Sequence, residues 1–391
     1  MVGMKALLCL LPVISTLGSC NPTRRCQDVT FSVSGTAENF NITGLPFDDP
    51  SSLAEILPTV QLPSITVSGS QTLAGRFCEP TVNILKNKGK LQVLFSSITG
   101  NRETWSAQGG PTFGFMPYKS ELYSWVDYAN AHGYATLALD RLGNGKSSHP
   151  DPVLVVQAPY ENALYHDLAQ QIRSGSTGSL PRKFDFLVWV GNSYGSQLGA
   201  ASAGRYPKDF DEYILTGFSK SVLPSLLGIS LQSPIPAAVA IPDRYGTLSP
   251  GYLTSSNEPG RTGSFFGSKA QADWDSTNSQ LFYDRRDVVS LGQFFSVYGL
   301  PFSGNGFTGR VLVLTGEQDQ AFCGPGNPTI GPAHCGPLLE QTGSLFPDAE
   351  YNWKSVDRTG HAIQFFRSAN KVRNIAHRFL AGEDFHGGPP A

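Results

Sequence analysis

The amino-acid sequence predicts an α/β fold in which a mostly parallel central sheet is flanked by helices. Short, continuous apolar segments alternate along the chain with segments whose apolar residues recur at helical spacing. Strands of this kind are buried on both faces, which is typical of a parallel sheet covered by helices. The 42 glycines and 28 prolines among 391 residues favour a loop-rich globular protein, and a hydrophobic fraction of 40% argues against disorder.

Residues 1–20 are predicted to be a secretory signal peptide. "MVGMK" carries one lysine, the apolar run "ALLCLLPVISTLG" follows, and small residues come next. The run is too short to span a bilayer comfortably, and Pro12 interrupts it. The alternative is a buried N-terminal segment. We expect a secreted protein with no stable membrane anchor, whose residues 21–391 form a single domain.

Four cysteines remain beyond the predicted signal peptide: Cys26, Cys78, Cys323 and Cys335. An even number in an oxidising compartment predicts disulfides. The short spacing between Cys323 and Cys335 favours a loop link, which leaves Cys26 and Cys78 as the second pair, although three pairings are open in principle. There is no Cys-x-x-Cys pair, so we predict no metal site.

Asn41 begins the sequon Asn41-Ile42-Thr43. In a secreted protein this pattern is a candidate glycosylation site, and the alternative is an unmodified asparagine in a strand or turn.

The elements follow in order along the chain. Residues 29–80 alternate apolar and polar side chains, which predicts antiparallel strands and loops. Residues 220–308 are rich in Pro, Gly, Ser and aromatics, which predicts a cap inserted between two late strands. Between and after these segments we expect strands at 91–97, 134–140, 184–191, 211–219, 309–319 and 349–357, and helices at 121–133, at 160–175 and over 361–380.

The segment "LVWVGNSYGS" (187–196) places Ser193 between two glycines at the end of a predicted strand. Gly-x-Ser-x-Gly is a weak pattern alone, but here a strand precedes it and a helix-compatible stretch follows. In such a tight turn a Cβ at either glycine would collide with neighbouring backbone. The pattern therefore indicates a serine nucleophile at the carboxyl end of the sheet.

A serine nucleophile needs a histidine base that a carboxylate orients. His361 follows the last predicted strand and is the best base by position. Asp319 follows the strand before it, and Asp357 is the competing carboxylate. The other histidines considered lie in predicted helices, in the cysteine loop or near the C-terminus: His166, His377, His334 and His386.

A formal net charge of −2 without a run of like charge argues against a nucleic-acid partner. We expect a small-molecule substrate and no cofactor, because a serine triad needs none. The oligomeric state stays open.

These motifs give the chain a resemblance to the α/β-hydrolase superfamily, particularly to secreted single-domain hydrolases of fungi, over residues 80–382. Besides "GNSYG", the segment "LDRLGNGKSS" (139–148) resembles the family's Asp-x-x-Gly-x-Gly-x-Ser loop, and "GYLTSSNEPGR" (251–261) resembles a cap segment. The resemblance implies an esterase or related acyl hydrolase with Ser193 as nucleophile, His361 as base and Asp319 as its orienter.

The chain departs from relatives after its third strand, where Ser96-Ser97 stands in place of His-Gly. The resemblance implies an oxyanion hole made by the backbone N–H groups of Tyr194 and Ile98, because backbone donors survive a change of side chain. The alternative is that the two serine hydroxyls donate instead.

The sequence thus predicts a secreted serine hydrolase that cleaves a carboxylic ester or related acyl bond through an acyl-enzyme. Alternatives are a lactonase, thioesterase, peptidase, lyase or cyclase in natural-product biosynthesis, and a non-catalytic binding protein on the same scaffold. Aromatic residues of the cap either contact the substrate or form the cap's own core: Phe265, Phe266, Phe282, Tyr283, Phe294 and Phe295.

Overall fold

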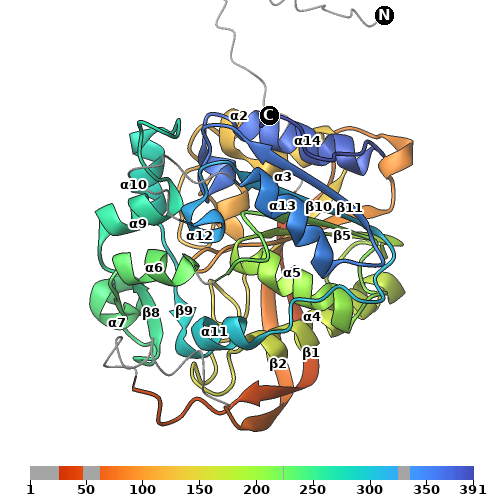
Figure 1. The fold of residues 1–391 in the computed structure, drawn as a ribbon. Coiled ribbons are helices and arrows are strands. Elements are labelled where there is room, and N and C mark those ends of the chain that lie inside the picture. The colour runs from red at the N-terminus through yellow and green to blue at the C-terminus, as the bar shows by residue number, and fades with distance from the viewer. Residues whose placement is uncertain (1–25, 47–61, 223, 325–334) are drawn as a thin grey trace, which may run out of the picture.

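The computed structural model describes residues 26–46, 62–222, 224–324 and 335–391. The predicted signal peptide and His334 lie outside these residues. An eight-stranded sheet with strand order β1-β2-β4-β3-β5-β6-β10-β11 runs through the centre of the fold (Figure 1). A second sheet has three strands in the order β7-β8-β9.

The sheet begins with a long antiparallel pair, β1 (Cys26–Phe40) and β2 (Ser64–Cys78), as the alternating pattern predicted. β2 also pairs antiparallel with β4, and from β4 onward in this order the strands are parallel to one another. These are β3 (Lys90–Phe95), β4 (Ala135–Leu139), β5 (Phe186–Asn192), β6 (Glu212–Thr216), β10 (Arg310–Gly316) and β11 (Glu350–Val356). The predicted α/β class with a mostly parallel sheet is confirmed.

Helices cover both faces of the parallel strands. Trp189 of β5 packs with α4 (Ala158–Ser174) and α5 (Tyr194–Arg205), while Val188 and Val190 pack with α3 (Trp125–Ala131) and α14 (Ala369–Leu380). Alternate residues of one strand thus enter two different cores, because strand side chains point to opposite faces.

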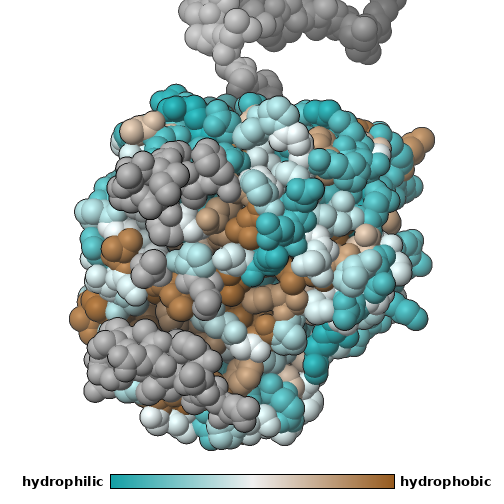
Figure 2. All heavy atoms as spheres, in the orientation of Figure 1, coloured by the Kyte–Doolittle hydropathy of each residue, from teal (hydrophilic) through white to brown (hydrophobic). Residues whose placement is uncertain are grey.

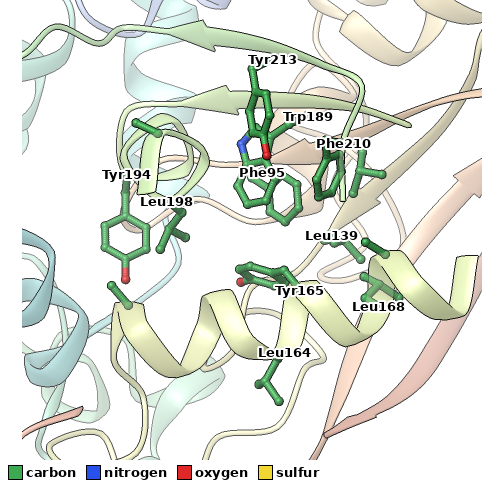
Figure 3. Close-up of a cluster of buried hydrophobic side chains, with 14 of the residues drawn as sticks. Phe95, Leu139, Leu164, Tyr165, Leu168, Trp189, Tyr194, Leu198, Phe210 and Tyr213 are labelled. Carbon is green, nitrogen blue, oxygen red and sulfur yellow. The ribbon is translucent and has the colours of Figure 1, made fainter. Parts of the chain in front are cut away.

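Figure 3 shows the core on the α4 side, which aromatic rings dominate. The rings of Phe95 and Trp189 stack with centroids 3.6 Å apart, and Tyr165 of α4 meets Phe95 edge-on at 4.9 Å. Large rings in contact bury much apolar area at a low cost in side-chain entropy. The turn between β5 and α5 therefore follows a strand whose side chains are tightly packed.

Two predicted helices differ in detail. The segment 121–133 forms two helices, α2 (Ser120–Tyr123) and α3, because Ser124 leaves the helical conformation and caps α3. The predicted helix over 361–380 was wrong over its first eight residues, since α14 begins only at Ala369. In residues 361–368 the N–H groups of Ala362 and Arg367 instead donate to the cap carbonyls of Phe265 and Asp273, at 2.9 and 3.1 Å.

Residues between β6 and β10 fold into helices around the small sheet and lie at one end of the central sheet (Figure 1). In Figure 2 apolar residues gather over this region, where Leu231 and Val239 are exposed. We call this interval, residues 220–308, the cap. Its elements are α6 (Pro224–Leu231), β7 (Pro234–Pro236), α7 (Ala237–Ala240), α8 (Pro242–Tyr245), β8 (Tyr252–Ser255), α9 (Glu258–Phe265), α10 (Ser276–Asp284), β9 (Val289–Ser290), α11 (Leu291–Ser296) and η3 (Val297–Gly299).

The remaining described elements are short: η1 (Leu85–Asn87), η2 (Arg102–Trp105), α12 (Gln320–Cys323), α13 (Gly336–Thr342), η4 (Gly343–Leu345) and η5 (Ile363–Phe365). In the part of the chain that the structure describes, none of the helices has the length and apolar character needed to cross a bilayer.

Hydrogen bonds join the cap to the loop that follows β3. The buried Arg261 donates from Nη1 to Thr99 Oγ1 at 2.7 Å, and Asp287 N–H donates to the Thr99 carbonyl at 2.8 Å. Asn101 Nδ2 donates to Asp287 Oδ2 at 2.9 Å. Burial lowers the pKa of Arg261 to about 9, and the nearby charge of Arg286 lowers it further.

Both predicted disulfides are present, Cys26–Cys78 and Cys323–Cys335. Cys26 and Cys78 are directly paired across β1 and β2. Asn41 lies between β1 and a turn at residues 43–44, and the Thr43 hydroxyl donates to its Oδ1 at 2.6 Å. The glycosylation of Asn41 stays a prediction.

Replacing Cys26 and Cys78 together by serine is expected to lower the free energy of unfolding by about 4 kcal/mol, because the link closes a loop of 52 residues. Denaturant unfolding of the oxidised proteins measures the loss. The matched control is Cys323→Ser with Cys335→Ser, whose 12-residue loop predicts a loss about 1 kcal/mol smaller. An unfolding free energy equal to that of the unaltered protein would contradict the prediction.

Candidate active site

Ser193 stands on a sharp turn between β5 and α5, with φ 55° and ψ −115°. A Cβ on Gly191 would lie 2.6 Å from the Gly195 carbonyl carbon, and a Cβ on Gly195 would lie 2.2 Å from the Phe95 carbonyl oxygen. Both flanking positions therefore require glycine. The strained backbone holds the Ser193 hydroxyl out from the carboxyl end of the sheet, as the motif predicts.

His361 connects Ser193 to Asp319. Its Nε2 lies 2.7 Å from Ser193 Oγ, and its Nδ1 lies 2.8 Å from Asp319 Oδ2. The three residues follow the carboxyl ends of β5, β11 and β10, so the parallel sheet brings together side chains far apart in the chain. With Nδ1–H donated to Asp319, the Nε2 lone pair is free to accept the serine proton.

Asp319 is fully buried and fixed in place. Its Oδ1 accepts from the N–H groups of Ala321 and Phe322 at 2.9 and 3.0 Å, which caps α12 and leaves Oδ2 for His361. Asp357, the competing carboxylate, is exposed to solvent.

Aromatic rings enclose the imidazole of His361. The Phe322 ring stacks on it at 5.3 Å between centroids, and the Phe265 ring of the cap lies at 5.4 Å. His361 is 4% exposed and Ser193 6% exposed, so the pair is shielded from bulk water.

The other described histidines lie elsewhere. His377 is buried in α14, where burial lowers its pKa to about 3 and Gln92 contacts its ring. His166 pairs with Asp209 at 2.8 Å on the outer side of α4. His386 is exposed near the C-terminus.

A small cavity of about 30 Å³ lies beside Ser193 and His361. This is room for about two water molecules, so an ester binds only if part of the lining moves. The lining is mainly apolar, and much of it comes from the cap: Ile98, Ser193, Tyr194, Gln197, Ser225, Gly228, Ile229, Gln232, Ser264, Phe265, Phe294, Val297, Tyr298, Ala321, Phe322 and His361.

Of the six cap aromatics considered from the sequence, Phe265 and Phe294 line this cavity. Phe266 and Phe282 instead pack in a buried cluster with Phe365 and its neighbours. Part of the set thus belongs to a buried core that the cap shares with residues 362–369, and contact of the others with a substrate stays a prediction.

Tyr194 and Ile98, the two residues predicted to supply backbone donors, both line the same cavity. The Tyr194 N–H is the first of α5 and has no partner within the helix. Ile98 also lines the cavity. The hydroxyls of Ser96 and Ser97 are fully buried without a hydrogen-bond partner among the described residues, and neither serine belongs to the described lining. Tyr194 and Ile98 thus border the cavity, and the described lining does not include Ser96 and Ser97.

A buried aspartate fixes the loop 139–148. Asp140 is fully buried and accepts from the N–H groups of Arg102 and Lys146 at 2.9 and 3.0 Å. Burial raises the pKa of Asp140 to about 7, and the charge of Arg102 opposes that rise. In the described part of the chain, no group of three His, Cys, Asp or Glu side chains could hold a metal ion.

Comparisons with known proteins identify a matching family and several similar solved structures. Residues 98–370 match the Alpha/beta hydrolase family. Among solved structures, the chain is similar to a thermophilic esterase from Thermogutta terrifontis, at 15% identity over 80% of this chain and 94% of that chain, with a TM-score of 0.48. It is similar to a putative hydrolase from Rickettsia typhi, at 10% identity over 92% and 100%, with a TM-score of 0.49.

A third similar structure is epoxide hydrolase A from Mycobacterium thermoresistibile, at 15% identity over 80% of this chain and 97% of that chain, with a TM-score of 0.48. A search of curated proteins found no match. The family match covers well over half of the chain, including Ser193, Asp319 and His361. The chain therefore belongs to the alpha/beta hydrolase family.

Proposed function

We propose that this protein is a secreted serine hydrolase that cleaves a carboxylic ester through an acyl-enzyme. The observation that carries the proposal is His361, whose two ring nitrogens lie within hydrogen-bond distance of Ser193 and Asp319 at once. Nucleophile, base and orienting carboxylate are the three parts that serine catalysis requires.

In the proposed reaction, Ser193 Oγ attacks the ester carbonyl carbon while His361 Nε2 accepts the serine proton. The negative charge that develops on the carbonyl oxygen is stabilised by the N–H groups of Tyr194 and Ile98. The imidazolium then gives its proton to the departing alkoxide, and an acyl-enzyme remains. Water activated by His361 hydrolyses it and restores the serine.

The lining of the cavity supports a small-molecule ester with an apolar part. Side chains such as Ile229, Phe265, Phe294 and Val297 offer no hydrogen bonds to a charged or strongly polar acyl group. Secretion is supported by the two disulfides, which persist in oxidising compartments.

Labelling with a fluorophosphonate probe tests the proposal. Folded protein is expected to form one adduct, on Ser193, that mass spectrometry locates, and His361→Ala is expected to abolish it. The matched control is His166→Ala, which removes a histidine with an equally close aspartate partner away from Ser193. A non-catalytic binding protein would give no adduct, and that result would refute the proposed function.

A further inference from the structure

A buried ion pair lies behind the candidate oxyanion hole. Arg141 follows β4 and Glu161 belongs to α4, and both side chains are fully excluded from solvent. Arg141 Nη1 lies 3.7 Å from Glu161 Oε1. Replacing a buried ion pair by apolar residues is often neutral or stabilising, so stability alone gives little reason for a pair here.

Arg141 also reaches the loop after β3. Its Nη2 donates to the Ser97 carbonyl at 3.1 Å, and the Gly100 N–H donates to the same oxygen at 3.1 Å. The Ser97 carbonyl and the Ile98 N–H belong to one planar peptide group and point in opposite directions. A cationic donor on the carbonyl therefore fixes the direction of the Ile98 N–H and polarises it as a donor.

Glu161 reaches the second donor segment. Its Oε2 accepts from the Tyr194 hydroxyl at 2.7 Å, and its Oε1 accepts from the Tyr165 hydroxyl at 2.9 Å. The Arg141 guanidinium also lies 4.5 Å from the centroid of the Tyr194 ring. In Figure 3 the Tyr194 side chain points from α5 toward α4. The side chain that follows the nucleophile is thus held at its ring and at its hydroxyl.

We propose that Arg141 is a positioning residue that orients and polarises the Ile98 N–H, and that Glu161 couples Arg141 to Tyr194. One buried ion pair then sets the geometry of both oxyanion donors, although neither side chain is among the residues lining the cavity within the described chain. The inference rests on the proposed function, because the two N–H groups matter only if an oxyanion forms between them.

The decisive variant is Arg141→Met, which keeps an unbranched apolar stem but removes the guanidinium with its charge and donors. We expect kcat for a p-nitrophenyl ester to fall about 10-fold to 100-fold, with KM within about twofold of the unaltered value. The affinity for a trifluoromethyl ketone, which forms a tetrahedral adduct with the serine, is expected to fall by the same factor as kcat.

Arg373→Met is the matched control. Arg373 is equally buried and donates to the carbonyls of Ser124 and Leu122 at 2.7 and 2.6 Å, on the opposite face of the sheet. Its loss is expected to lower the melting temperature while kcat and the ketone affinity of the folded protein stay unchanged. An Arg141→Met protein that behaves in this way would overturn the inference.

Two further variants keep the test decisive if Arg141→Met does not fold. Arg141→Lys keeps one point charge that cannot reach both Ser97 and Glu161 as the guanidinium fork does, so kcat is expected to fall with KM unchanged. Tyr194→Phe removes only the hydroxyl that Glu161 holds, and a severalfold loss of kcat is expected. Unchanged kcat in Arg141→Lys and Tyr194→Phe would contradict the inference.

Ester turnover by the unaltered protein, abolished by Ser193→Ala, tests the proposed function separately. Without that turnover both proposals fall. Turnover at the unaltered rate in all three positioning variants contradicts only the role of Arg141 and Glu161.

Discussion

Ser193→Ala is expected to lower kcat/KM for a p-nitrophenyl ester by roughly 10⁴-fold to 10⁶-fold while the protein stays folded. The substitution removes the nucleophile and leaves the turn unchanged, because alanine and serine tolerate the positive φ at this position about equally. Initial rates measure the activity, and a thermal melt confirms the fold.

Ser202→Ala is the control for this variant. Ser202 is buried in the same helix, α5, but it does not line the cavity within the described residues. We expect full activity in the folded Ser202→Ala protein. Turnover in Ser193→Ala at the unaltered rate would show that another group performs the chemistry.

Asp319→Asn is expected to lower kcat by about 10⁴-fold. The amide can still accept from the Ala321 and Phe322 N–H groups, but its NH₂ group facing His361 Nδ1 favours the tautomer that carries the proton on Nε2. A protonated Nε2 cannot accept the proton of Ser193. Single-turnover acylation rates measured across pH would locate the loss in the chemical step.

Asp357 supplies the matched control, since it follows the neighbouring strand and was the competing carboxylate on sequence grounds. It is exposed, so Asp357→Asn is expected to leave kcat within about twofold of the unaltered value. If Asp357→Asn lost activity and Asp319→Asn did not, the result would show that Asp357, and not Asp319, orients His361.

Much of the architecture follows from local pattern. The apolar runs of β3 to β6 and of β10 predict buried parallel strands because helices must cover both faces of such strands. Ser193, Asp319 and His361 each follow a strand, and a parallel sheet brings strand ends to one edge. The contact among these three residues could therefore be expected from their order, although the distances could not.

No sequence pattern predicts the contacts that support the candidate site. Arg141 lies within the motif of residues 139–148, but nothing in that motif indicates that it reaches Ser97 or pairs with Glu161. These contacts join segments that become neighbours only when the sheet is assembled. The predicted start of α14 was wrong for the same reason, because the N–H groups of Ala362 and Arg367 donate to carbonyls of the cap instead of to an α-helix.

The attachment of the cap to Thr99 has a consequence for substrate selectivity. Thr99 is the neighbour of Ile98, and its hydroxyl donates to the Ile98 carbonyl while accepting from Arg261 of the cap. A bulky ester that pushes the cap outward would pull on the segment that carries a candidate oxyanion donor. Size discrimination is then expected to appear in kcat more than in KM, because an oversized ester still binds but misaligns the donor on which its transition state depends.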